Sequence, residues 1–98
     1  MKKLTTVHYK GKSFVVVSNE QGILCAIDTK YLDGQGRLTT CLNGLQMLVD
    51  QKENTLPAMI NRIKHHVEIE IFVAENKLSF YNENDMRKLL EFSHTLPF

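Results

Sequence analysis

The chain has 98 residues, of which 43% are hydrophobic and 23% charged, and these ordinary globular values exclude a disordered or low-complexity protein. Its 12 Lys and Arg and 11 Asp and Glu give a formal net charge of +1, which argues against a protein that binds by neutralising phosphates along a duplex. A chain of this length buries roughly 60–65% of its unfolded surface, so we expect one domain over residues 1–98 that folds without a metal or disulfide.

The N-terminal segment Met1–Thr6 is charged and contains no apolar stretch of the kind found in secretory signals. No window approaches the roughly 18 apolar residues of a membrane-spanning helix. We therefore expect a cytoplasmic protein with no membrane partner. Cys25 and Cys41 lie outside any CxxC motif, and we interpret both as buried thiols rather than as a disulfide.

The first third of the chain predicts three strands, over residues 3–9, 12–18 and 22–28. Lys10-Gly11 supplies a short turn between the first two, because Gly adopts positive φ readily. Asn19–Gly22 supplies a second turn. The simplest arrangement is an antiparallel meander with one apolar face to cover.

The middle of the chain allows two interpretations. Asp33–Gly36 is a loop by composition. Asn43-Gly44 is a strong hairpin signal, yet the Leu and Val residues after it also fit a short helix capped by Asn43. We favour a short strand followed by one or two helical turns, and the choice between hairpin turn and helix start stays open.

The segment from Leu56 to Asn76 predicts one long helix of about twenty residues. Asn54 or Thr55 can cap it, and Pro57 suits the first turn, where its missing N–H costs nothing. Residues 67–73 alternate as a strand would. We prefer the helix because no Gly or second Pro follows Pro57 within the segment, so a strand there would follow the helix without any loop.

This helix carries two apolar stripes on opposite sides. The first has members at helical spacing and needs a core, which we expect to be the sheet; it contains Leu56, Ile60, Ile63, Val67, Ile71 and Ala74. The second contains Ile69, Phe72 and Val73. A second layer of the same chain or a dimer partner would cover it.

A final helix is predicted after Asn82 or Asn84, either of which can cap it. Its apolar face contains Met86, Leu89, Leu90 and Phe92. The fold class that follows is α+β, with a small antiparallel sheet of three to four strands packed against one long helix and a C-terminal helix.

The sequence offers no catalytic constellation, metal site or cofactor motif. His65 and His66 are helix neighbours and point about 100° apart, so they cannot easily share one ion. Glu68 and Glu70 point about 200° apart on the same helix, which defeats paired-carboxylate chemistry. The glycine-rich segment 34–39 has Thr39 where a dinucleotide fingerprint needs its third Gly.

The best candidate for partner binding is the second stripe with its polar margin, formed by Arg62, His65, Ile69 and Phe72. These residues predict a non-enzymatic binding or interaction module that forms a homo-oligomer, or that takes an unidentified protein or small-molecule ligand.

The alternative is a nucleic-acid-binding module that uses a basic N-terminal hairpin. That hairpin contains Lys2, Lys3, Lys10 and Lys12, with Tyr9 between them. Lysines on an edge strand also prevent pairing with other sheets, so nucleic acid is the less favoured partner.

Overall fold

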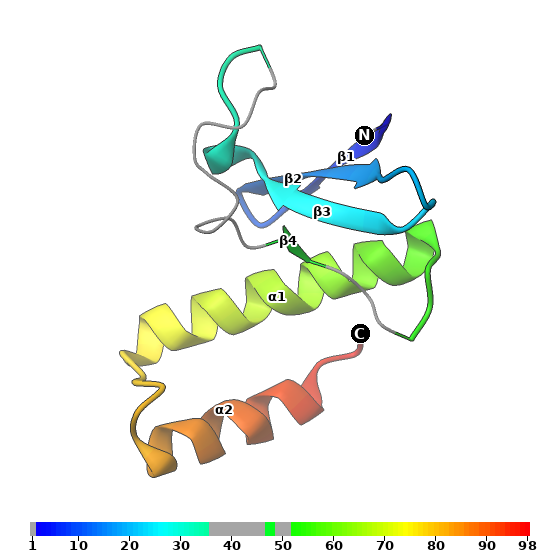
Figure 1. Cartoon of the computed structure of the whole chain (residues 1–98). Coiled ribbons are helices and arrows are strands. Elements are labelled where there is room, and N and C mark those ends of the chain that lie inside the picture. Colours follow the sequence, from blue (N-terminus) through cyan, green and yellow to red (C-terminus); the bar gives the residue numbers. More distant parts are fainter. Residues whose placement is uncertain (1, 36–46, 49–51) are drawn as a thin grey trace.

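The computed structural model describes residues 2–35, 47–48 and 52–98, and confirms the α+β class. A four-stranded sheet forms one layer, the long helix α1 the next, and α2 lies on the side of α1 away from the sheet (Figure 1). The elements in chain order are β1 (Lys2–Tyr9), β2 (Lys12–Ser18), β3 (Leu24–Asp28), the short helix η1 (Thr29–Tyr31), β4 (Met47–Leu48), α1 (Leu56–Asn76) and α2 (Glu83–Thr95).

The sheet is an antiparallel meander in the order β1-β2-β3-β4, as predicted for its first three strands. Lys10 and Gly11 both have positive φ, 48° and 79°, which is the backbone of a hairpin turn that matches the strand twist. This turn sets a register in which Val7 lies opposite Phe14. These two residues, with Tyr9, therefore share the sheet face that meets α1.

The Asn43-Gly44 segment lies outside the described residues. Met47 and Leu48, for which we favoured a helical turn, instead form β4 and pair with Ile27 and Ala26 of β3. The helical interpretation is therefore wrong at these two positions. The physical reason is the outer edge of β3, which offers unpaired N–H and C=O groups to any extended segment that reaches it.

Helix α1 spans 21 residues and confirms the helical interpretation of residues 67–73. The Thr55 hydroxyl caps it by accepting from the Ala58 N–H at 3.3 Å, and Pro57 lies in the first turn. The helix ends at Lys77, which adopts the left-handed conformation with φ 51° and whose N–H bonds to the Val73 carbonyl.

The core lies between α1 and one face of the sheet. Ile63 and Val67 of the predicted first stripe are fully buried there, and Met59 is 1% exposed. The other buried members of this core are Phe14, Val16, Leu24 and Ala26. The predicted stripe was wrong at its ends, because Leu56 and Ala74 are exposed and Met59 packs instead.

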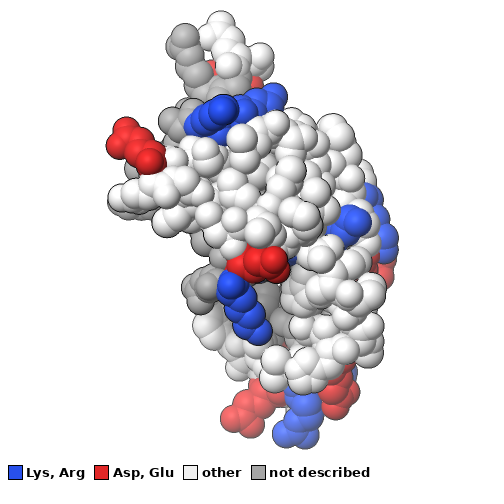
Figure 2. All heavy atoms as spheres, turned by 90° about the vertical axis from the view of Figure 1, so that its right-hand side faces the viewer, with Lys and Arg blue, Asp and Glu red and all other residues white. Residues whose placement is uncertain are grey.

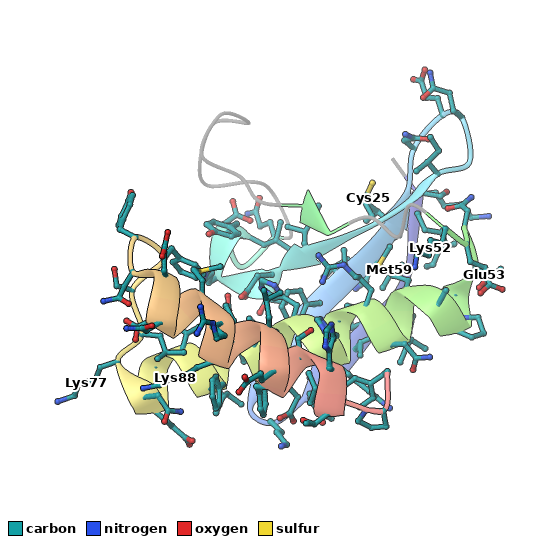
Figure 3. All side chains as sticks on the ribbon, turned by 90° about the horizontal axis from the view of Figure 1, so that it is seen from below. Cys25, Lys52, Glu53, Met59, Lys77 and Lys88 are labelled. Carbon is teal, nitrogen blue, oxygen red and sulfur yellow. The ribbon has the colours of Figure 1, made fainter. Side chains whose placement is uncertain are left out.

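The second face of the sheet has its own apolar cluster. Val17, Cys25 and Ile27 are buried there, packed with Tyr31 and Leu32. Cys25 is thus on the opposite side of the sheet from Met59; both are marked in Figure 3. It is a free thiol whose pKa is raised by burial, since the thiolate would lose hydration. Cys41 lies outside the described residues.

Asn54 does not cap α1 but joins the helix to the sheet. Its side-chain oxygen accepts from the Leu24 N–H at 2.8 Å, and its amide donates to the Gly22 carbonyl at 2.9 Å. Asn54 immediately precedes the capping residue Thr55, so these two bonds link the β2–β3 turn to the start of α1. They hold the N-terminal end of α1 next to the first residue of β3, Leu24.

Helix α2 begins as predicted, with the Asn82 side chain accepting from the N–H groups of Asn84 and Asp85 at 2.9 and 3.2 Å. Leu89 is its buried residue. The segment after α2 returns to the first strand, where the rings of Phe98 and Tyr9 meet edge to face at 6.2 Å. Neither α1 nor α2 is long and apolar enough to cross a membrane.

Candidate functional site

Two of the four predicted partner-binding residues contact α2 of the same chain. The rings of Phe72 and Phe92 stack at 4.1 Å between centroids and 4° between planes. The imidazole Nε2 of His65 lies 2.9 Å from the Ser93 hydroxyl. Phe72 of the second stripe thus packs against the C-terminal helix, one of the two occupants expected for the stripe, whereas Ile69 and Val73 face a cavity between α1 and the sheet.

The other two predicted residues lie elsewhere on α1. Ile69 lines a cavity between α1 and the sheet, and Arg62 is half-buried beside His65. Burial first, and then the charges of Arg62 and His66, hold the pKa of His65 below its ordinary value. The structure therefore does not bring Arg62, His65, Ile69 and Phe72 into one open surface, and their role in partner binding stays a prediction.

An exposed apolar surface lies instead at the turn between the helices. Phe80, Tyr81 and Leu90 are 63%, 101% and 58% exposed. With Met86 they form what we call the turn patch, around a surface hollow of about 330 Å³. The sequence analysis overlooked Phe80 and Tyr81; the available signal was two adjacent aromatic residues in a short polar connection between helices.

The turn that carries these aromatic residues is held by hydrogen bonds. The N–H of Ser79 donates to the Asp85 carboxylate at 2.9 Å, and the N–H of Tyr81 donates to the Ser79 hydroxyl at 3.2 Å. Asn82 then caps α2. The exposed rings of Phe80 and Tyr81 therefore stand on a fixed backbone, which lowers the entropy cost of contact with a partner.

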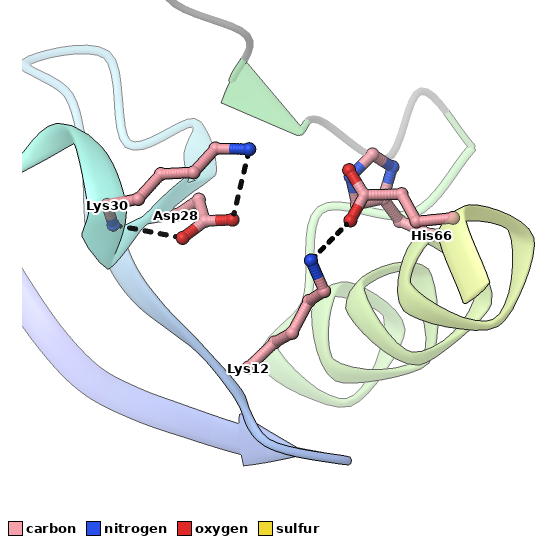
Figure 4. A network of polar contacts seen from close by, with 5 residues as sticks. Lys12, Asp28, Lys30 and His66 are labelled. Atoms are coloured by element: carbon pink, nitrogen blue, oxygen red, sulfur yellow. Dashed lines mark hydrogen bonds and ion pairs between the residues drawn. The ribbon is translucent and has the colours of Figure 1, made fainter. Parts of the chain in front are cut away.

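A second feature is a charged network between α1 and the sheet. Glu70 pairs with His66 through Oε1 at 2.9 Å and with Lys12 of β2 through Oε2 at 3.1 Å (Figure 4). Nearby, the Lys30 ammonium lies 3.8 Å from Asp28. Burial opposes ionisation of Glu70, but Lys12 and His66 outweigh it, and the pKa of Glu70 lies below its ordinary value.

This network forms one part of the wall of a cavity of about 600 Å³, which we call the α1 cavity. Apolar side chains of α1 and the α1–α2 turn form the rest. The lining residues are Lys12, Lys30, His66, Ile69, Glu70, Val73, Ala74 and Phe80. The cavity therefore combines cations, a carboxylate and an apolar surface.

Two of the four lysines of the basic hairpin form ion pairs with glutamates of α1. Lys10 pairs with Glu68, which also accepts from the Tyr9 hydroxyl at 2.8 Å, and Lys12 pairs with Glu70. Lys2 and Lys3 are exposed. On the face shown in Figure 2, the described Lys and Arg side chains lie as separate groups among Asp and Glu rather than as one stripe.

The adjacent histidines of α1 serve different contacts. His65 meets Ser93 of α2, whereas His66 meets Glu70 and places its ring edge to face with Phe14 at 5.9 Å. Among the described residues, no three His, Cys, Asp or Glu side chains gather in a group that would hold a metal ion.

Comparison of the chain with protein-family models, curated proteins and solved structures found no match.

Proposed function

We propose that this protein is a non-enzymatic interaction module that self-associates through the turn patch. The observation that carries the proposal is the exposure of three large apolar side chains, Phe80, Tyr81 and Leu90, at 63%, 101% and 58%. Single exposed apolar residues are common, but a contiguous apolar group on a fixed backbone is typical of a contact surface. Aromatic residues are also enriched at the centres of protein interfaces.

A second copy of the chain is the occupant that fits this surface. In a two-fold dimer the same patch faces itself, so each projecting group needs a recess within the same patch. The fully exposed Tyr81 stands beside the hollow of about 330 Å³ and can enter the hollow of the partner. Glu83 and Arg87 line the hollow, so opposite charges are available to face each other across the two-fold axis.

The predicted stripe of α1 is a second contact region within the same proposal. Helix α2 has 13 residues and α1 has 21, so α2 covers only part of the length of α1. Arg62 and Ile69 are half-buried rather than buried. Arg62 lies toward the start of α1, away from the turn patch, so a different part of the partner would contact it.

The test is the solution mass, measured by light scattering after size exclusion over a range of concentrations. We expect a mass near twice 11.3 kDa for the wild type. Tyr81→Ser should reduce the mass to that of one chain without unfolding, because Tyr81 is fully exposed. Lys88→Ser, at an exposed site on α2, is the control and should leave the dimer intact.

Two results would overturn this proposal: a wild type that stays monomeric at every concentration, or a dimer that Tyr81→Ser does not weaken. Phe72→Glu distinguishes the α1 stripe from the turn patch. If Phe72→Glu gives a folded monomer and Tyr81→Ser a dimer, self-association uses the stripe. Circular dichroism shows whether each variant has folded.

The nucleic-acid alternative depends on Lys2 and Lys3, the exposed part of the basic hairpin. The Lys10 and Lys12 ion pairs disfavour it, since each cation already neutralises a carboxylate. Binding of single-stranded oligonucleotide that weakens steeply with added salt would support this alternative, and no binding at low salt would remove it.

A further inference from the structure

The α1 cavity is a second candidate site, a ligand site that shares Phe80 with the turn patch. Its volume of about 600 Å³ falls in the range of roughly 300–1,000 Å³ that is usual for small-molecule sites. Four parts of the chain meet there: Lys12 from β2, Lys30 from η1, the face of α1 that begins at His66, and Phe80 from the α1–α2 turn. The cavity thus lies where the sheet and the long helix diverge.

The charged and polar lining residues of α1 are His66 and Glu70, with Ile69 between them, and the lining beyond Glu70 is apolar. His66 and Glu70 lie beside the two lysines, as Figure 4 shows for Lys12, Lys30 and His66. Val73 and Ala74 lie about one turn further along the helix, toward the turn that carries Phe80. A ligand that fills this cavity therefore needs one charged or polar end and one apolar body.

The two carboxylates at the polar end already have partners. Oε1 of Glu70 meets His66, and its buried Oε2 pairs with the Lys12 ammonium at 3.1 Å. A ligand that displaced Lys12 would leave that oxygen uncompensated, so Lys12 stays with Glu70. Asp28 is only 9% exposed and accepts from the Lys30 backbone N–H at 3.0 Å.

Lys30 is the group with hydrogen-bonding capacity to offer. Its ammonium lies 3.8 Å from Asp28, too far for a hydrogen bond, and its side chain is 55% exposed. An ammonium group carries three donors and no acceptor, so it selects an acceptor-rich anion. Lys12 is already paired with Glu70, so Lys30 alone among the described lining lysines has donors to offer, which favours a single negative charge over a dianion.

We propose that the α1 cavity binds a small organic carboxylate with an apolar body. The carboxylate meets the Lys30 ammonium, and the apolar body lies against Val73, Ala74 and Phe80. Lys12 keeps its pairing with Glu70.

The test is a titration of the full ¹⁵N-labelled chain with decanoate, kept below its micellar concentration, and followed by amide chemical shifts. Decan-1-ol, which has the same apolar body without the charge, is the matched ligand control. We expect saturable shifts that are largest at Lys30 and at residues 69–74. Lys30→Gln should weaken decanoate binding about tenfold or more, while Lys88→Gln on α2 leaves it unchanged.

A second pair of variants tests the apolar end. Ala74 is exposed and lines the cavity, so Ala74→Phe should fill the cavity and abolish binding without unfolding the chain. Glu75→Phe adds the same ring at the next exposed position, which does not line the cavity, and should leave binding intact. The proposal is overturned by no saturable decanoate binding, by equal affinity for decanol, or by unchanged affinity in Lys30→Gln or Ala74→Phe.

Discussion

Phe72 of α1 stacks on Phe92 of α2 at 4.1 Å, and the two rings are nearly parallel at 4°. Phe72 belongs to the second apolar stripe of α1 and not to the core between α1 and the sheet. Through this ring pair it packs α2 against α1. The His65–Ser93 pair lies two turns earlier on α1, so the contact continues along the helix. This contact leaves an apolar surface exposed at the α1–α2 turn, beside Tyr81.

The first prediction concerns the energy of this ring pair. In a double-mutant cycle of Phe72→Leu and Phe92→Leu, we expect a coupling of about 0.5–1.5 kcal/mol, because aromatic pairs contribute this much beyond burial of their area. The free energies of unfolding are measured in urea for the wild type, both single variants and the double variant. Additive losses would show that stacking contributes nothing beyond burial of each ring.

The second prediction concerns pH. Because burial and the charges of Arg62 and His66 lower the pKa of His65 in the folded state, the unfolded chain takes up this proton first as the pH falls. The stability that neutral His65 provides is complete above its ordinary pKa of 6.5 and is lost as the pH falls from there to the lower, folded value. Urea unfolding at pH 7.5 and at pH 5 measures the loss.

His65→Gln is the control for this pH dependence, since Gln keeps a hydrogen-bonding group toward Ser93 without titrating. As the pH falls from 7.5 to 5, the free energy of unfolding should decrease more for the wild type than for the variant. A difference that stays constant with pH would mean that His65 titrates alike in the folded and unfolded chains.

The third prediction concerns Asn54. Replacing it with Ala removes both bonds to the β2–β3 region, at Leu24 and Gly22, and should destabilise the fold by about 1–2 kcal/mol. Asn61→Ala is the matched control at an exposed position of α1, where Ala is the better helix former and stability should not fall. Equal effects of the two substitutions would show that the Asn54 bonds add nothing to stability.

Sequence reasoning recovered the elements whose ends have local causes. The Lys10-Gly11 turn, the capping groups of Thr55 and Asn82, and the absence of Gly or a further Pro within α1 are each readable from a few neighbouring residues. Such signals act through the backbone of their own turn, so no tertiary contact is needed to interpret them.

The features that sequence reasoning missed depend on distant parts of the chain. Met47–Leu48 is a strand because it meets the edge of β3, about twenty residues earlier. Phe80 and Tyr81 are exposed because α2 turns back beneath α1 and leaves their turn uncovered. The α1 cavity needs Lys12, Lys30 and His66 to converge from three elements, and no spacing in the sequence encodes that convergence.

The last prediction concerns the end of α1. Lys77 adopts φ 51°, ψ 46°, a left-handed conformation in which a side chain with a Cβ crowds the following carbonyl. Gly adopts this conformation without that cost, although it gives the unfolded chain more conformational entropy. The first effect is the larger one, so Lys77→Gly should stabilise the protein by about 0.5–1 kcal/mol. Lys77 extends away from the fold, as Figure 3 shows, and little packing is lost. Lys77→Ala removes the same charge but keeps the Cβ, so it should not stabilise; equal urea midpoints for the Gly and Ala variants would contradict the backbone explanation.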